Sequence, residues 1–424
     1  MRLLAALPPT QLCWLCLASL CWAFGFGVGA PLASLWLQDA GHSNTVIGWN
    51  TGVYYVGIAL AAVATPWMMR RWGKGCPVLG IAASAVTVAV FPWGGSLLGL
   101  FALRLANGVA GAMSLIPVET YVNHQAIPSE RARSFGYYAL SIGLGLALGT
   151  LIGMQLYTDH PYLAFVLGGL VTLAGSLVLQ VAMRWPVMHR DEGDCATPLN
   201  FRTNILCFGS GWAQGFLEGG MIALLPIYLL GIGFSDDGAS WLMSCTMLGV
   251  IGAQVPVAWL ADRFGRQTVL IGCYAVAIGG LLVLPSLRGT APLAFWLLVV
   301  AAGSAAFYPL GLALLGERTG STALARANAW FLAINCLGSL VGPVVAGTAM
   351  DLFGNQAFFY AGEAAVAGVL VVSLGSHLMG RRSRAHHIPK FETRVDRRPP
   401  EGIAGPQGSR LVGIPSDQVP GRAA

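Results

Sequence analysis

Charged residues are scarce in this sequence: they make up 10% of its 424 residues, whereas 55% of the residues are hydrophobic. Soluble domains usually carry about a quarter charged residues. The composition therefore excludes an ordinary soluble protein and predicts an integral membrane protein. It also excludes a nucleic-acid-binding protein, because no basic patch stands out that could meet a phosphate backbone. We expect the lipid bilayer as a partner and no nucleic acid.

Disulfide frameworks and metal-binding patterns are missing as well. Nine cysteines are present, but the close pair Cys13 and Cys16 falls inside an apolar run, where we interpret both as small membrane residues. No pair of histidines at helical spacing predicts a metal site. We expect no metal and no cofactor, and the proton is the coupling ion that we consider.

Long apolar runs are what the sequence has in abundance. A helix needs about 20 mainly apolar residues to cross a bilayer. The first run stays apolar to Trp36, beyond the short core of a signal peptide, so we interpret it as a membrane span. Twelve runs predict an all-α protein with twelve transmembrane helices, at 11–37, 45–69, 76–93, 96–126, 131–157, 161–184, 205–231, 240–261, 268–287, 292–316, 326–350 and 357–379.

The few charges in the loops are sorted by sign. Loops after odd-numbered spans hold Asp39, Asp159, Asp236, Asp237 and Asp351, with Arg288 as their one basic residue. Most other basic residues follow even-numbered spans or lie in the middle loop. Because positive loops stay in the cytoplasm, we expect a multi-pass protein of the cell membrane with both termini in the cytoplasm.

The sequence repeats itself after 192 residues. Residues 35–49, "LWLQDAGHSNTVIGW", align with residues 227–241, "IYLLGIGFSDDGASW", so that Ser43 matches Ser235. Transporters built from two parallel repeats show this pattern, and we predict two pseudo-symmetric halves. The predicted parts are a six-helix bundle (1–184), a cytoplasmic linker (185–204), a second six-helix bundle (205–380) and a disordered cytoplasmic tail rich in Pro, Gly and charge (381–424).

Charge gathers in one loop, where residues 259–268 read "WLADRFGRQT". A carboxylate at a helix end can meet the positive N-terminus of a neighbouring helix, and such contacts can set which state of a transporter dominates. In the first-half copy, "PWMMRRWGKG", Arg70 takes the acidic position, and Glu317 is one candidate to pair with it. The other interpretation is that these charges only fix orientation. The predicted gating residues are Asp262, Arg263, Gly265, Arg266, Arg71, Gly73, Lys74 and Arg133.

The loop around residues 259–268 resembles G-x-x-x-D-R-x-G-R-K, the loop signature of the major facilitator superfamily. Ala258 and Gln267 depart from that signature. The stretch "RLANGVAGA" resembles the family's R-x-x-Q-G, with Asn107 in place of Gln. The stretches "PVETYV" and "FYPLGLAL" are similar to the poorly characterised YcaD-like branch. The resemblance covers residues 10–380 and implies a twelve-helix alternating-access transporter, without implying a substrate. The fifth span has the glycines of the antiporter signature but not its proline.

The eleventh span is rich in small residues, "GSLVGPVVAG". Small residues let membrane helices approach closely, and proline bends them. We predict helix-packing roles for Gly338, Gly342, Pro343 and Gly347.

Function is expected where the two halves diverge. A charge at mid-bilayer costs about 2.5–3.5 kcal/mol and is a functional candidate by default. Arg104, Glu119 and Glu218 are such charges, and each occurs in one half only. Arg104 and Glu119 share a helix face, but about 22 Å of rise separates them, so they cannot pair.

We predict that Glu218 or Glu119 binds a proton or a cationic substrate group, because a carboxylate in a poorly solvated cavity suits reversible protonation. Arg104 would orient an anion or tune a carboxylate. The alternative is a buried ion pair or a helix-end charge. The other candidates for substrate or proton binding are Asn107, Gln214, Gln254, Tyr55 and Trp212.

These patterns together predict a secondary active transporter that moves a small organic solute by alternating access, coupled to protons, with export favoured because the cavity is apolar. An uncoupled facilitator and a proton symporter for uptake of a sugar or other metabolite stay open. A membrane enzyme would need clustered His, Asp or Ser groups, and a sensor would need a soluble output domain. We therefore expect a monomeric protein that is not an enzyme and has a small-molecule substrate.

Overall fold

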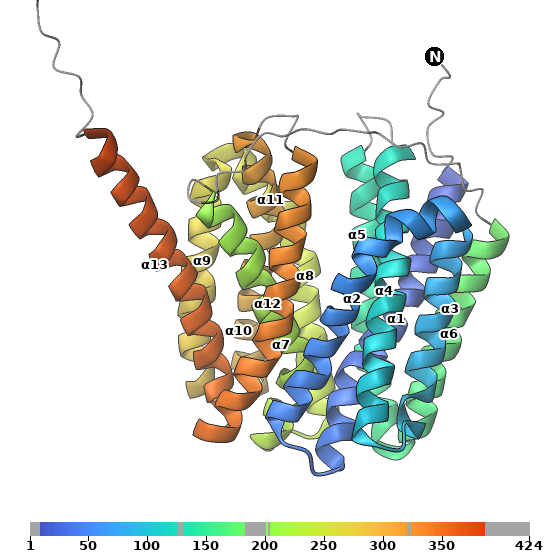
Figure 1. The fold of residues 1–424 in the computed structure, drawn as a ribbon. Helices are drawn as coiled ribbons and strands as arrows, with labels where there is room; N and C mark the ends of the chain where they lie inside the picture. The colour runs from blue at the N-terminus through green and yellow to red at the C-terminus, as the bar shows by residue number, and fades with distance from the viewer. Residues whose placement is uncertain (1–8, 126–130, 183–200, 202–203, 320–323, 386–424) are drawn as a thin grey trace, which may run out of the picture. The chain divides into compact units, whose positions relative to one another are not determined.

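A computed structural model describes residues 9–125, 131–182, 201, 204–319 and 324–385. Over these residues the fold is helical and contains no strand, as the composition predicts. The helices, labelled in Figure 1, are α1 (Pro9–Asp39), α2 (Asn44–Trp72), α3 (Gly75–Val90), α4 (Leu97–Gln125), α5 (Arg131–Asp159), α6 (Pro161–Ala182), α7 (Ile205–Gly231), α8 (Asp236–Phe264), α9 (Arg266–Val283), α10 (Thr290–Ala305), α11 (Phe307–Arg318), α12 (Leu324–Phe353) and α13 (Ala357–Ala385), with the short 3-10 turns η1 (Phe91–Trp93) and η2 (Leu284–Ser286).

Twelve spans in the described part of the chain are long and apolar enough to cross a membrane, which confirms the predicted number. α10 and α11 form a single span, Thr290–Arg318, that is interrupted at Ala306. Pro309 explains the break, because its ring cannot donate a helical hydrogen bond and clashes with the preceding turn. The predicted span 292–316 is therefore built from two helices. By contrast, α4 continues through Pro117.

We call α1–α6 the first half and α7–α13, up to residue 379, the second half. The linker side is the end of these helices at which α6 ends and α7 begins, and the far side is the end at which α1 meets α2. The linker predicted at 185–204 and the tail predicted at 381–424 lie mostly outside the described residues, and α13 ends at Ala385.

The sequence repeat is also a repeat of structure. The Ser43 and Ser235 side chains cap α2 and α8 by accepting from the backbone N–H groups of Val46 and Gly238, which satisfies donors that a helix start leaves free. Both helices end at a glycine with positive φ, Gly73 at 52° and Gly265 at 86°, a conformation that other residues rarely adopt. Equivalent helices also pack alike: α1 with α5 as α7 with α12, and α2 with α4 as α8 with α10.

The two halves meet along a seam, formed mainly by α2 with α12 and α5 with α8, with additional contacts of α1 and α2 to α7. At Gly48 a Cβ atom would collide with the carbonyl oxygen of Pro343, and at Gly347 it would collide with that of Asn44. The absence of side chains thus lets α2 and α12 touch near the far side. Figure 1 shows the two helices diverging toward the linker side.

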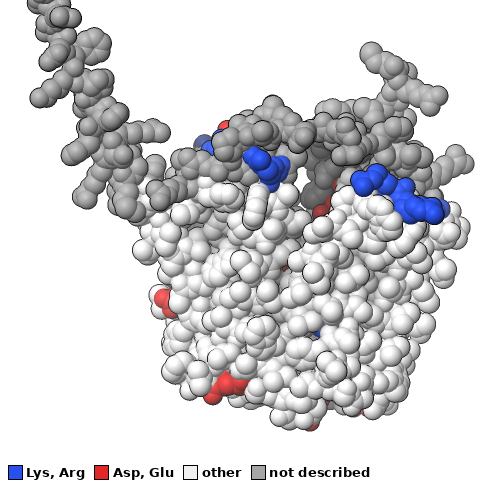
Figure 2. Space-filling model, in the orientation of Figure 1, with Lys and Arg blue, Asp and Glu red and all other residues white. Residues whose placement is uncertain are grey.

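Charge is distributed as expected for a membrane protein. On the face shown in Figure 2, Lys and Arg side chains gather along the linker-side rim, above a wide band that is almost free of charge. Large hydrophobic side chains such as Val63, Val181 and Val255 are about four-fifths exposed, at 86%, 84% and 79%. In a bilayer these side chains would face lipid, and the uncharged band would lie in its hydrocarbon core.

Candidate functional site

The far side of the seam is closed by the carboxylate of Asp351, at the end of α12. Its Oδ1 accepts hydrogen bonds from the backbone N–H and the side-chain amide of Asn44, at 3.0 and 2.9 Å. Its Oδ2 accepts from the backbone N–H and the hydroxyl of Thr45, at 2.8 and 2.6 Å. An anion at a helix N-terminus is favoured by the free N–H groups there. These three residues form what we call the far-side contact, and they join the second half to the first.

The middle of the seam is apolar and tightly packed. Ile222 of α7 is buried against Ala30 of α1 and Met247 of α8, and Phe26 packs against the same cluster. Glu218 lies one turn from Ile222 toward the linker side, on the same face of α7. Its side chain is exposed, although residues on both sides of it along the helix are buried. A solvent-accessible space between the halves therefore begins at Glu218 and extends toward the linker side.

Glu218 is placed among groups from both halves. Its Oε2 accepts a hydrogen bond from the side-chain amide of Gln214, at 3.1 Å. Tyr54 and Tyr55 of α2, Tyr308 of α11 and Cys336 of α12 all lie within its electrostatic range. In the described part of the chain it forms no ion pair. The carboxylate is thus available to a proton or to a cation from solution.

Aromatic rings of the first half form a continuous strip, which we define as Trp22, Phe26, Tyr54 and Tyr55. Trp22 and Phe26 stack with 5.9 Å between centroids and 4° between planes. Phe26 and Tyr54 are 5.2 Å apart, as are Tyr54 and Tyr55. Tyr54 and Tyr55 bring this aromatic strip within range of Glu218.

Arg104 lies behind this strip and is only 3% exposed. Its guanidinium is 5.5 Å from the centre of the Tyr54 ring, and its Nη1 donates to the carbonyl oxygen of Gly29 at 3.4 Å. A cation over an aromatic face is stabilised by the ring quadrupole. Arg104 therefore contacts Tyr54, and the structure does not bring it into an ion pair with Glu218.

Asn107, the other candidate on this part of α4, is anchored to α3. Its amide nitrogen donates to Thr87 Oγ1 at 2.7 Å and to Ser84 Oγ at 3.2 Å. This arrangement ties two helices of the first half together.

Two further candidates, Gln254 and Glu119, are at least partly exposed. Gln254 is exposed and falls two turns from Met247 on the same, seam-facing side of α8. Glu119 of α4 is half-buried, and its electrostatic range includes Tyr138 of α5 and Tyr308 of α11. Tyr308 therefore lies within range of both Glu119 and Glu218.

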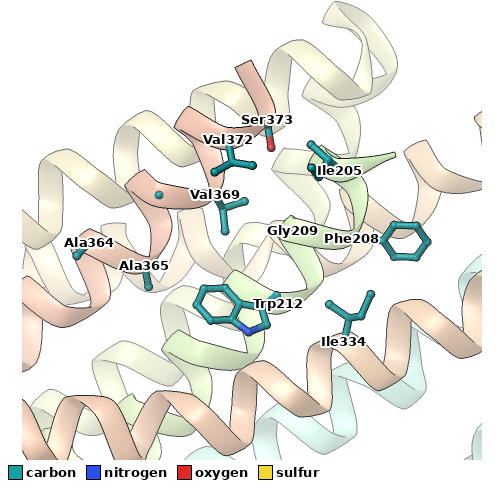
Figure 3. A pocket seen from close by; sticks show the side chains of 11 residues that line it. Ile205, Phe208, Gly209, Trp212, Ile334, Ala364, Ala365, Val369, Val372 and Ser373 are labelled. Carbon is teal, nitrogen blue, oxygen red and sulfur yellow. The ribbon is translucent and has the colours of Figure 1, made fainter. Parts of the chain in front are cut away.

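Trp212 faces a different space. Figure 3 shows its indole in an apolar cavity of about 400 Å³ between α7, α12 and α13, beside Ile334, Ala365 and Val369. The structure thus separates Trp212 from the Glu218 face of its own helix, although sequence analysis grouped the two residues.

The predicted gating residues of the second half contact their own half. Arg266 pairs with Glu317 at 3.0 Å and donates to the carbonyl oxygen of Ala313, so Glu317 is not the partner of Arg70. Arg263 lies over the Trp259 ring, with its guanidinium 5.7 Å from the ring centre, and Asp262 is exposed.

The first-half loop behaves in the same way. The ammonium of Lys74 donates to the carbonyl oxygen of Gln180 in α6, and Arg71 is exposed. The side chain of Arg133 lies outside the described residues, although α5 includes its backbone. These loop contacts lie within one half, whereas the far-side contact joins the two halves.

The predicted helix-packing residues lie where α12 meets its neighbours. A Cβ atom at Gly338 would collide with the carbonyl oxygen of Trp212, and one at Gly342 with that of Phe216. Gly347 and Pro343 instead meet α2 at the far side, as described above. α12 is thus packed against both its own half and the other half.

Sequence reasoning missed Tyr308, Cys336 and the cross-half role of Asp351. A signal for Tyr308 was available, because it directly precedes Pro309, which aligns with Pro117 in the repeat, and a tyrosine occurs in only one of the two copies. Asp351 was noted only as a loop acid. Its partners Asn44 and Thr45 lie more than 300 residues away in sequence.

The described residues form twelve spans in two similar halves. An accessible carboxylate, Glu218, lies on the seam between the halves. This is the architecture of a membrane transporter. The Major Facilitator Superfamily profile matches residues 15–196 and 207–412 of the sequence. The chain therefore belongs to the Major Facilitator Superfamily and is a multi-pass membrane protein.

Two relatives are similar over most of their length. The uncharacterized MFS-type transporter YfkF of Bacillus subtilis (strain 168) is 27% identical over 349 residues, which cover 80% of this chain and 88% of that protein. The uncharacterized MFS-type transporter YcaD of Escherichia coli O9:H4 (strain HS) is 27% identical over 377 residues, covering 85% and 92%. Both relatives confirm the resemblance seen in the sequence, and neither carries a named substrate.

Solved structures agree with this fold. The nucleoside transporter NupG superposes with a TM-score of 0.71 at 14% identity, covering 88% of this chain and 99% of that one. A bacterial homologue of the human lysosomal transporter Spinster, in an inward-facing and occupied conformation, gives a TM-score of 0.69 at 15% identity, covering 89% and 98%. At these identities the likeness concerns the fold alone.

Proposed function

We propose that the protein is a proton-linked secondary carrier that exports a small organic solute from the cytoplasm by alternating access. Glu218 is the residue at which proton and substrate meet. The single observation that carries this proposal is the exposed Glu218 carboxylate, which lies on the seam between the halves and forms no ion pair in the described part of the chain. A carboxylate that solvent reaches, but whose neighbours along the helix are buried, is suited to reversible protonation.

The packing of the halves supports alternating access. The far-side contact and the Ile222 cluster close the seam on one side, while Glu218 and Gln254 are exposed on the other. The basic residues of the loops favour the linker side as the cytoplasmic side. The conformation described here would then receive substrate from the cytoplasm, and both termini would lie there.

A carrier moves its substrate without changing it chemically. In this proposal the protein acts as such a carrier and not as an enzyme. It works as a monomer in the lipid bilayer, with a small-molecule substrate and with no cofactor besides the coupling proton. A membrane potential supplies about 2.3 kcal/mol per charge per 100 mV, and a pH gradient adds to it. A pH gradient is sufficient to drive export by proton exchange without ATP, whereas a membrane potential acts only on an exchange that moves net charge.

The experiment is a metabolite screen with the purified full chain in proteoliposomes. A mixture of small organic solutes is offered, with and without a pH gradient, and the solutes that cross are identified by mass spectrometry. We expect at least one solute whose movement speeds up when protons can flow in exchange. A solute that moves equally well without a gradient, and moves no protons, would identify an uncoupled facilitator instead.

A further inference from the structure

The two halves differ sharply at one pair of equivalent positions. The repeat of 192 residues aligns Trp22 with Gln214 and Phe26 with Glu218. Each pair lies one turn apart on the first helix of its half. In α1 the pair is a stack of two aromatic rings, and in α7 it is a hydrogen-bonded amide and carboxylate. From the first half, the seam therefore presents the partly exposed ring of Phe26, and from the second half it presents the exposed carboxylate of Glu218, whereas Trp22, Tyr54 and Tyr55 are buried.

The charges around this space favour a cationic ligand. Glu218 is exposed and has no ion-pair partner in the described part of the chain. The nearby cation, Arg104, is buried behind Tyr54 and does not present its charge to the space. An anionic ligand would therefore meet the negative charge of Glu218, and the positive charge of Arg104 would not be accessible to it. A neutral sugar would leave the carboxylate without an opposite charge.

The aromatic strip favours a flat or cationic group. Aromatic faces attract cations and stack with planar rings. Phe26 is partly exposed at the border of the space, and Tyr54 and Tyr55 extend the strip toward Glu218. An organic cation with an aromatic group could therefore place its charge at Glu218 and its ring against Phe26.

We propose that the space between Glu218 and the aromatic strip binds a monovalent organic cation, namely a protonated amine that carries an aromatic group. This inference rests on the proposed function and names its substrate class. Ammonium and proton compete for one carboxylate, so each transport cycle exchanges one amine cation for one proton. One positive charge leaves for each that enters, and the exchange is electroneutral.

Other groups near Glu218 do not provide a second charge for this exchange. They are Tyr54 and Tyr55 of α2, Tyr308 of α11, Cys336 of α12 and Gln214 on the same helix. Arg104 of α4 stands behind Tyr54, and Glu119 of α4 is the second carboxylate within range of Tyr308. Glu119 is therefore included in the test as its own variant, Glu119→Gln.

The test uses the purified full chain in detergent and four probes that separate charge from shape: tryptamine, its neutral counterpart tryptophol, its anionic counterpart indole-3-acetate, and hexylamine. Binding is measured by isothermal titration calorimetry. We expect tryptamine to bind at least about tenfold more tightly than tryptophol, which corresponds to one charge interaction. Indole-3-acetate should not bind. Equal affinities for tryptamine and tryptophol, or tighter binding of indole-3-acetate, would overturn the proposal.

Four variants assign the effect to residues. Glu218→Gln should abolish the preference for tryptamine over tryptophol, while Glu363→Gln, a carboxylate change on α13 outside the seam, should preserve it. Phe26→Leu should weaken tryptamine but not hexylamine, because only tryptamine has a ring to stack. If Glu119→Gln removed the preference and Glu218→Gln did not, the site would be misplaced. Thermal unfolding of each variant shows whether it is folded.

The failure of this proposal is distinguishable from that of the carrier function. If the metabolite screen finds proton-linked transport while the amine probes show no charge preference, the carrier stands and the substrate class is wrong. If tryptamine binds as expected but neither it nor protons move across the proteoliposome membrane, the site stands and the carrier function is wrong. In transport assays with tryptamine, a pH gradient should drive exchange, and a membrane potential alone should not.

Discussion

The Asp351 carboxylate accepts the backbone N–H of Thr45 at 2.8 Å, so the end of α12 caps the start of α2 in the other half. The repeat of 192 residues aligns Asp351 with Asp159, and Asn44 and Thr45 with Asp236 and Asp237. The equivalent end of α5 therefore faces a helix start that already carries two acids. Asp159 is exposed and forms no hydrogen bond in the described part of the chain. The far side is thus held by one such contact, not by a symmetric pair.

Replacing Asp351 with asparagine should loosen the far-side contact. An amide has one acceptor oxygen in place of two, so its NH2 group would face the donors of either Asn44 or Thr45 and lose their hydrogen bonds. Hydrogen bonds to a charged group contribute about 1.5–3 kcal/mol each, so we expect the amides of the first turn of α2 to exchange with deuterium roughly tenfold faster. Hydrogen-exchange mass spectrometry of Asp351→Asn checks this expectation. The matched variant Asp159→Asn should leave α2 unchanged, and an equal effect of both variants would contradict the account.

A second far-side contact should be obtainable by copying the first. Changing Asp236→Asn together with Asp237→Thr gives α8 the same two residues that begin α2, and it removes two acids from the first turn of α8. We expect this double variant to unfold at a higher temperature than the parent protein and to turn over more slowly, because the far side must open during each cycle. Thermal unfolding and transport assays test both effects. The single variant Asp236→Asn, which gives α8 only the first of these two residues, should give a smaller increase.

Close packing of α12 predicts a strong position dependence of glycine substitutions. Gly342→Ala places a methyl group against the carbonyl oxygen of Phe216, and overpacking of this kind costs about 1–3 kcal/mol. At Gly368 of α13 nothing lies within 4 Å of the new methyl group, and alanine is the better helix former there. We therefore expect Gly342→Ala to lower the unfolding temperature and Gly368→Ala to leave it unchanged or raise it. The reverse order would show that α7 and α12 are not packed as described.

The charged loop after α8 should matter for switching between states more than for stability. Glu317→Gln breaks a partly exposed pair with Arg266, and such pairs contribute about 0–1 kcal/mol. Asp262 is exposed in this conformation, so Asp262→Asn should leave the unfolding temperature unchanged. If Asp262 contacts the first half when the linker side closes, the same variant should slow transport. An unchanged transport rate for Asp262→Asn would leave its charge with a role in orientation alone.

Much of the fold could be predicted because its signals are local. Apolar length defined the spans, and Gly73 and Gly265 marked tight turns that only residues tolerant of positive φ can form. The divergence of the repeat also singled out Glu218 correctly as an unusual position, and the structure places it on the seam. The far-side contact was not predictable in this way, because Asp351 and Thr45 are brought together only by the packing of the two halves.

The assignment of side chains to cavities was also beyond the sequence. Trp212 and Glu218 lie six residues apart on one helix, but helical geometry separates them by about 120°, so they face different spaces. The sequence of α7 does not specify which of its faces meets α13 and which meets α1. The hydrogen bonds of Asn107, a predicted binding residue, to Ser84 and Thr87 were likewise not readable from the sequence.

The most direct test of the central claim is substrate-induced proton flux in proteoliposomes that contain either the parent protein or Glu218→Gln. The lumen holds a pH-sensitive dye, and the substrate is one that the metabolite screen identifies. The account predicts that substrate addition produces a proton flux with the parent protein and with the control variant Glu363→Gln, and none with Glu218→Gln. An undiminished flux with Glu218→Gln would show that the proton and the substrate do not meet at this residue.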